Sequence, residues 1–185
     1  MTHMDEIAQT KPNLKWVFQT ASRTIAFGFG SGLSPIAPGT VGTLWAWAAF
    51  LAGEYFLTTE DFLWIIGGGI LLGCWICGQV SEELGKKDFG GIVWDEIVAF
   101  WLVLLVIMPT NIWMQVLAFG LFRFFDALKP GPIGMIDQHF KNLASDQQPS
   151  NLLQIIWRGF GIVVDDLAAA FFTLLVLALV QFAIK

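Results

Sequence analysis

Three charged residues, Arg123, Asp126 and Lys129, follow one another at three-residue steps within an aromatic and otherwise apolar stretch. On a helix this spacing places all three side chains on one face. The helix is expected to stop at Pro130, because proline cannot continue a helix and disfavours helix at the residue before it. Charges of both signs are costly against lipid, so they should face a polar cavity or the cytoplasmic interface. The alternative is an interfacial helix end whose charged side chains simply snorkel to water.

The composition of the chain is that of an integral membrane protein. Of its 185 residues, 56% are hydrophobic and only 14% are charged, and the apolar residues occur in blocks. The net charge of -5 gives no indication of a nucleic-acid partner. Cys74 and Cys77 have the C-x-x-C spacing of metal or redox sites, but no second cysteine pair or histidine cluster accompanies them. We interpret them as small packing residues of a membrane helix.

The apolar blocks predict an all-α, multi-pass membrane bundle. Residues 1–26 predict a polar tail and an amphipathic segment at the membrane surface, without a signal peptide. Residues 27–185 predict a single membrane-embedded domain, in which the hydrophilic stretch 137–151 forms an exposed loop. In chain order, the predicted apolar segments are residues 44–57, 62–80, 97–108, 112–125 and 167–184. The third and fourth segments form a hairpin whose arms are short for full spans.

Residues 27–43 are rich in glycine, proline, serine and threonine, which predicts an irregular segment rather than a helix or central strand. Glycines let backbone N–H groups approach an anion, and Ser31, Thr40 and Thr43 add hydroxyl groups. The stretch is neither a Walker A loop nor a dinucleotide fingerprint, since Leu33 stands where the third glycine should fall. It fits a structural turn and a phosphate cradle equally well.

The distribution of lysine and arginine predicts how the chain crosses the membrane. Basic residues precede the first apolar segment, follow the second and lie between the fourth and fifth, whereas the turns at 58–61 and 109–111 have none. Five segments with a cytoplasmic amino terminus satisfy this pattern. Four polar clusters are thereby expected to meet at the cytoplasmic face: residues 27–43, 86–96, 123–129 and 158–166.

This convergence gathers five carboxylates, Asp95, Glu96, Asp126, Asp165 and Asp166. Left unpaired, they would repel one another. A divalent cation relieves the repulsion, and a donor set of oxygen atoms favours Mg²⁺ or Mn²⁺ over Zn²⁺. Arg123 and Lys129, with the glycine-rich stretch, are then placed to bind phosphate. The alternative is a network of ion pairs and helix caps, in which Asp165 and Asp166 mark a helix amino terminus.

Four blocks of sequence resemble the phosphatidylglycerophosphatase A family of bacterial membrane lipid phosphatases. They read GFGSGLSPIAPGTVGT at 28–43, GGIVWDEIVAFW at 90–101, FRFFDALKPGPI at 122–133 and GIVVDDLAAA at 161–170. Their order and spacing also agree, from about residue 27 to the last helix. The chain departs from the family pattern in two places. Arg158 interrupts a run that is usually rich in glycine, and the polar insert at 137–151 is longer than usual.

The resemblance implies Mg²⁺-dependent hydrolysis of phosphatidylglycerophosphate to phosphatidylglycerol and inorganic phosphate at the inner membrane. It also implies an all-α bundle around one central helix. Other phosphatase chemistries fit poorly. A cysteine nucleophile needs an arginine six residues on, where the chain has Val80 and Glu83, and the histidines, His3 and His139, are not clustered with arginines. No Asp-x-Asp sequence is present for an aspartyl-phosphate route.

Metal-assisted attack by water on the phosphomonoester is therefore the predicted reaction. The five carboxylates are the predicted metal ligands, one of them acting as general base. Arg123 and Lys129 are predicted to stabilise charge on the phosphoryl oxygens, which Ser31, Thr40 and Thr43 would orient. The main alternative is a small cation or proton transporter with carboxylates near mid-bilayer and a pseudo-repeat. A non-catalytic membrane scaffold would not explain the charged stripe. A lipid phosphotransferase would need a multi-Asp helical signature, which this sequence lacks.

Overall fold

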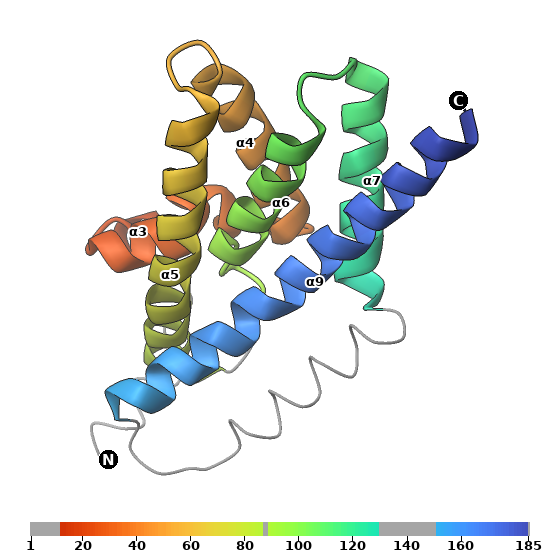
Figure 1. The fold of residues 1–185 in the computed structure, drawn as a ribbon. Helices are drawn as coiled ribbons and strands as arrows, with labels where there is room; N and C mark the ends of the chain where they lie inside the picture. Colours follow the sequence, from red (N-terminus) through yellow and green to blue (C-terminus); the bar gives the residue numbers. More distant parts are fainter. Residues whose placement is uncertain (1–11, 87–88, 130–150, 185) are drawn as a thin grey trace, which may run out of the picture.

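The computed structural model describes residues 12–86, 89–129 and 151–184, and every regular element within these ranges is a helix (Figure 1). The all-α prediction is confirmed there. The predicted tail at 1–11 and the polar insert up to residue 150 lie outside the described residues. The elements are α2 (Leu14–Val17), α3 (Ala21–Ala26), the 3₁₀ element η1 (Gly28–Leu33), α4 (Pro38–Gly53), α5 (Thr59–Glu83), α6 (Trp94–Ile107), α7 (Ile112–Leu128) and α9 (Leu152–Ile184).

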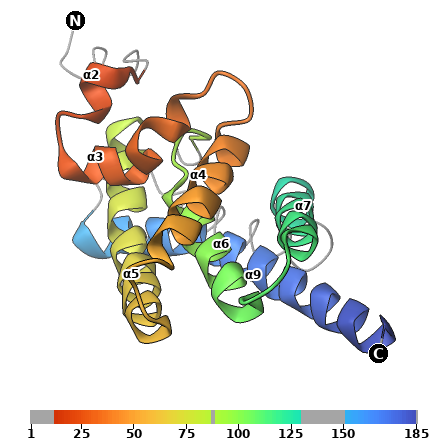
Figure 2. The ribbon, with the colours of Figure 1, turned by 90° about the horizontal axis from the view of Figure 1, so that it is seen from above.

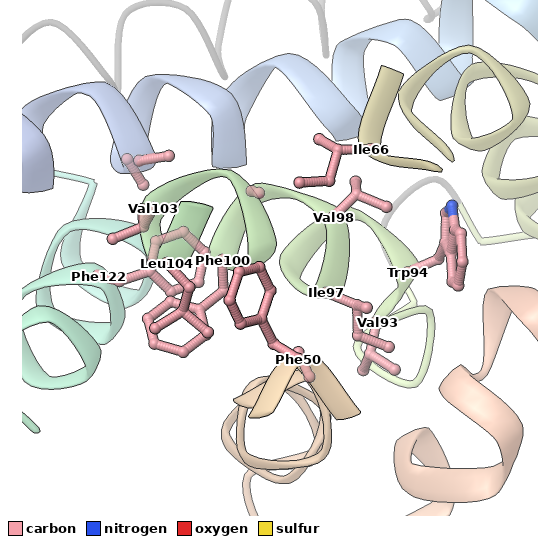
Figure 3. Close-up of a cluster of buried hydrophobic side chains, with 14 of the residues drawn as sticks. Phe50, Ile66, Val93, Trp94, Ile97, Val98, Phe100, Val103, Leu104 and Phe122 are labelled. Carbon is pink, nitrogen blue, oxygen red and sulfur yellow. The ribbon is translucent and has the colours of Figure 1, made fainter. Parts of the chain in front are cut away.

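Helix α6 is the centre of the bundle. After its two acidic residues it is apolar on every side, and a helix of that kind is stable only when it is surrounded. Ile97, Phe100 and Leu104 are fully buried. Figure 3 shows α4, α5, α7 and α9 around this helix, and all four pack against it. The central helix that the resemblance implied is therefore present.

The ends of the helices are arranged so that the charged residues meet. Helices α6 and α7 form the predicted hairpin, and Asn111 begins α7 by accepting a 2.9 Å hydrogen bond from Met114 N. Helix α4 runs beside α6, where Trp101 Nε1 donates to Ala46 O at 2.8 Å. The amino ends of α4 and α6 and the carboxyl end of α7 consequently lie at one end of the bundle.

The glycine-rich stretch is only partly irregular. Phe29 and Gly30 have φ of 56° and 99°, and Ala37 has φ of 46°. The prediction that residues 27–43 contain no regular helix is wrong from Pro38 onward, where α4 begins. Proline is favoured at the first helical position, since its missing N–H would have no partner there and its fixed φ suits the helix.

Helix α9 is longer than predicted. It begins at Leu152, so Asp165 and Asp166 lie in its middle, and their interpretation as caps of a helix amino terminus is wrong. Gly159, which reads as a helix breaker, is instead a packing residue at the crossing with α5. A Cβ atom on Gly159 would overlap the carbonyl oxygen of Cys74, and one on Gly78 would overlap that of Ile155. Small residues let two helices approach closely, and Gly78 and Gly159 allow α5 and α9 to do so.

Helices α5 and α9 are long and apolar enough to cross a membrane, judged by length and composition. The 25 residues of α5 correspond to about 37 Å, against a bilayer hydrocarbon core of about 30 Å. Large apolar side chains such as Trp64, Trp113 and Phe182 are exposed, as lipid-facing side chains would be. The number of spans, predicted as five, stays a prediction.

The amino-terminal helices belong to the same core as the rest of the chain, since Val17 and Ala26 are fully buried in it. Seen from above, α2 and α3 lie on one side of the bundle and the carboxyl end of α9 projects on the other (Figure 2). Arg23 links α2 and α3 to α5: its Nε lies 2.8 Å from Glu83 Oε2, and its guanidinium stacks over Trp16.

Candidate active site

Arg123 connects three helices at the converging end of the bundle. Its Nη1 lies 3.0 Å from Glu96 Oε1 on α6 and 2.6 Å from Asp126 Oδ2 on α7. The same atom donates to Thr43 Oγ1 on α4 at 3.3 Å. The side chains of Arg123, Glu96 and Asp126 are 18%, 13% and 11% exposed. These ion pairs are largely shielded from water and therefore stronger than surface pairs.

Lys129 ends α7 and reaches the middle of α9. Its Nζ lies 3.0 Å from Asp165 Oδ2. Its backbone is left-handed, with φ of 42° and ψ of 54°, so the helix stops before Pro130 as predicted. A left-handed non-glycine residue is strained, and such strain is concentrated at functional sites. The predicted stripe of three charges is thus two residues on the helix, Arg123 and Asp126, and a third at its cap.

The remaining carboxylates lie next to these ion pairs. The Asp166 side chain interacts electrostatically with Asp126, Asp95 and Glu96. Asp95 is 8% and Asp166 3% exposed. Counted as ionised, the five predicted carboxylates exceed the two cations Arg123 and Lys129 by three negative charges.

This excess of buried negative charge, carried by hard oxygen atoms, fits a divalent cation such as Mg²⁺. In the part of the chain that the structure describes, no three His, Cys, Asp or Glu side chains converge as a ready metal-ligand group. Mg²⁺ does not need such a group, since it usually keeps several waters and takes one or two carboxylates together with substrate phosphate. The donor chemistry of the site therefore fits this ion.

The predicted hydroxyl groups are placed differently from one another. Thr43 is fully buried; its Oγ1 donates to Gly39 O at 2.8 Å and accepts the bond from Arg123. Ser31 Oγ donates to Gly28 O at 2.8 Å within η1. Thr40 lies in the first turn of α4, but it does not line the cavity of about 300 Å³ between η1, the start of α4 and the turn at 89–91. Phosphate binding by the three hydroxyls stays a prediction.

Two residues near the site were not predicted to belong to it. Cys77 is buried in the core, as its interpretation as a packing residue requires, but it also interacts electrostatically with Asp95 and Asp166. No sequence signal joins these residues, because they come from three different helices. Gly39 lies against Glu96 and Arg123, and its position just after the proline that begins α4 was the only available signal.

Comparison with known proteins gives one consistent family. The model of the family described as phosphatidylglycerophosphatase A matches residues 24–146. The chain is 39% identical to the phosphatidylglycerophosphatase A of Haemophilus influenzae over 85% of this chain and 87% of that protein. It is 38% identical to that of Escherichia coli over 78% of this chain and 74% of that protein.

A more distant relative, 31% identical over 86% of this chain and 93% of its own length, is described as a putative phosphatidylinositol-3-phosphatase of Bacteroides thetaiotaomicron. No solved structure matches the chain. The matched family region contains Glu96, Arg123 and Lys129, and it ends before Asp165 and Asp166. The extent of these matches shows that the chain belongs to the phosphatidylglycerophosphatase A family and is an enzyme, a phosphatase.

Proposed function

We propose that this protein hydrolyses the terminal phosphomonoester of phosphatidylglycerophosphate, giving phosphatidylglycerol and inorganic phosphate, and that it requires Mg²⁺. The observation that carries the proposal is the convergence of Arg123 and Lys129 with buried carboxylates from α6, α7 and α9. Cationic side chains that can bind phosphoryl oxygens lie beside carboxylates that can bind a metal ion or transfer a proton. Family membership supports the same reaction.

In the proposed reaction, a water oxygen attacks phosphorus and the bond from phosphorus to the glycerol oxygen breaks. An ionised carboxylate of the Asp126 and Asp166 pair accepts the proton of the water. The same carboxylate then gives this proton to the leaving glycerol oxygen, which remains with the lipid as a hydroxyl group. Arg123 and Lys129 stabilise the charge on the phosphoryl oxygens once their present carboxylate partners share them with the substrate.

Two carboxylates among Asp95, Asp126 and Asp166 are the proposed protein ligands of Mg²⁺, and water and substrate phosphate would complete its coordination. When bound, the ion would supply positive charge that polarises the phosphoryl oxygens and holds the attacking water. Glu96 and Asp165 have a different proposed role, because each is ion-paired with one of the two cations. They orient Arg123 and Lys129 toward the phosphate.

The proposed location is the bacterial inner membrane, with α5 and α9 in the bilayer and the site facing the cytoplasm. The acyl chains of the substrate then stay in the lipid while the headgroup enters at the end of the helix bundle. The exposed aromatic and aliphatic side chains of α5 and α7 support contact with lipid.

The test is phosphate release by the purified protein in detergent micelles, with Mg²⁺ and after chelation. Three substrates are compared: phosphatidylglycerophosphate, phosphatidylinositol 3-phosphate and a soluble phosphomonoester. The proposal requires Mg²⁺-dependent release with the highest kcat/KM for phosphatidylglycerophosphate. A higher value for the inositol lipid would reassign the substrate to that of the Bacteroides relative. Absence of release from all three by folded protein would overturn the phosphatase proposal, and ion binding by the same residues would be measured next.

A further inference from the structure

Gly39, the second residue of α4, lies against the side chains that join α6 to α7. A Cβ atom on Gly39 would overlap Glu96 Oε1 and lie 2.7 Å from Glu96 Cδ and 2.9 Å from Arg123 Nη2. Real Cβ atoms essentially never come this close to other heavy atoms. Gly39 is buried within the first turn of a regular helix, so space rather than an unusual backbone conformation requires a glycine.

The neighbours of Gly39 differ from those of the packing glycines. At Gly32, Gly78 and Gly159, an added Cβ atom would overlap a backbone carbonyl group, so the elements themselves would have to move apart. At Gly39 the overlapped atoms are the ends of two long, charged side chains. Such side chains rotate away without moving the backbone. A methyl group at this position is therefore expected to rearrange the site while the fold persists.

The amino end of α4 adds a reason for the carboxylate to lie there. Its N-cap residue, Ala37, offers no side-chain hydrogen bond to the first turn. The amino terminus of a helix carries a partial positive charge that favours acidic groups. The carboxylate of Glu96 lies beside Gly39 in this first turn, and the ion pair with Arg123 holds the guanidinium next to it at 3.0 Å.

We propose that Gly39 is a positioning residue of the active site: its missing side chain leaves the space in which the Glu96 carboxylate and the Arg123 guanidinium meet beside α4. The proposal rests on the proposed function for its kinetic consequence. It predicts that Gly39→Ala displaces both charged groups and lowers turnover without preventing folding. The geometric part, the contact between Gly39 and Glu96, is tested without any substrate.

The kinetic experiment compares Gly39→Ala with Gly120→Ala, a matched control in α7 whose added Cβ atom meets no heavy atom within 4 Å. We expect Gly39→Ala to lower kcat for phosphatidylglycerophosphate by about tenfold or more while KM stays within about threefold, the pattern of an interaction lost in the transition state. Gly120→Ala should keep the wild-type kcat.

Combining Gly39→Ala with Glu96→Asp, which shortens the side chain by one methylene, should give an enzyme at least as active as Gly39→Ala alone. Wild-type kcat in Gly39→Ala, or simple multiplication of the two losses in the double variant, would overturn the proposal.

The substrate-free experiment measures thermal unfolding in detergent for wild type, Gly39→Ala, Glu96→Ala and the double variant. The intrinsic helix preference of alanine is the same in both backgrounds and cancels. We expect Gly39→Ala to lower the unfolding temperature only when Glu96 is present. An equal decrease in both backgrounds would mean that the methyl group disturbs the backbone, and the proposal would be wrong. If the wild type releases no phosphate, the proposed function fails, but this cycle still decides whether Gly39 makes room for Glu96.

Discussion

Lys129, the residue that ends α7, lies 3.0 Å from Asp165 in the middle of the 33-residue helix α9. This ion pair places the midpoint of α9 level with the end of the hairpin formed by α6 and α7. The acids of α9 are thereby next to those at the amino end of α6. Because α9 crosses the other helices obliquely (Figure 1), the acidic residues at its centre lie at the end of the bundle.

The same relationship bears on the transporter alternative. A cation or proton pathway is expected to place carboxylates near mid-bilayer. Asp165 and Asp166 lie in the middle of α9, so they would lie near mid-bilayer if α9 ran straight across the membrane. Pairing with the cap of α7 places Asp165 instead at the end of the helix bundle, which the proposed location puts at the depth of lipid headgroups. The phosphatase proposal needs that depth, since the phosphate of the substrate cannot enter the hydrocarbon region.

Replacing Lys129 with glutamine should remove the charge while keeping a polar side chain, one heavy atom shorter, and the left-handed backbone. We expect kcat/KM for phosphatidylglycerophosphate to fall by about tenfold or more, because one of the two proposed phosphoryl-binding cations is lost. Lys15→Gln, which changes an exposed lysine of α2, is the control and should keep full activity. Equal activity of the two variants in the phosphate-release assay would contradict the role of Lys129.

Asp126→Asn should abolish turnover in a folded protein. The change removes the negative charge of the side chain that lies 2.6 Å from Arg123 Nη1 and that interacts with Asp166. We expect a loss of about a hundredfold or more in kcat, measured by phosphate release at saturating Mg²⁺.

The matched control is Asp61→Asn, because Asp61 is an exposed acid whose side chain accepts from Thr58 in the capping box of α5. That change should lower the unfolding temperature and leave kcat unaltered. Retention of wild-type turnover by Asp126→Asn would remove this residue from the proposed machinery.

Much of the fold followed from local patterns in the sequence. The hairpin of α6 and α7 was predictable because Pro109 and Asn111 interrupt two apolar runs, and Asn111 indeed caps α7. The length of α9 was not predictable in the same way. Gly159 suggests a break, but its close packing against α5 gives this glycine a different purpose within a continuous helix.

For the site, charge distribution predicted which segments meet but not which residues pair. Spacing within one helix predicted the contact of Arg123 with Asp126, since residues three apart share a face. The contacts of Arg123 with Glu96 and of Lys129 with Asp165 join different helices. They depend on the crossing angles and registers of the packed helices, which the sequence does not state locally.

Asp166→Asn should stabilise the protein in the absence of divalent cations. Asp166 is 3% exposed and adds to an excess of negative charge. Its removal relieves repulsion with Asp95, Glu96 and Asp126, while the amide still forms hydrogen bonds. We expect a higher unfolding temperature in chelator together with loss of phosphate release, the usual trade-off at a strained site.

Mg²⁺ provides a second comparison for the same variant. Added Mg²⁺ should raise the unfolding temperature of the wild type, because a ligand that binds only the folded state stabilises it. The increase should be smaller for Asp166→Asn if this carboxylate is a metal ligand. An unfolding temperature in chelator below that of the wild type would show that Asp166 stabilises the fold, contrary to this prediction.

Thr43→Val tests whether the buried hydroxyl of α4 acts on the substrate or on Arg123. Valine has nearly the same shape, but it removes the acceptor for Arg123 Nη1 and the donor to Gly39 O. Because Thr43 is fully buried, we expect it to position Arg123 rather than to touch phosphate. The expected result is a fall in kcat of about three- to tenfold with little change in KM, since the guanidinium is then less well aligned for the transition state. Thr43→Ser restores the hydroxyl and should restore kcat, which a loss of packing alone would not explain. A rise in KM without a change in kcat would instead indicate direct binding of the phosphate by Thr43.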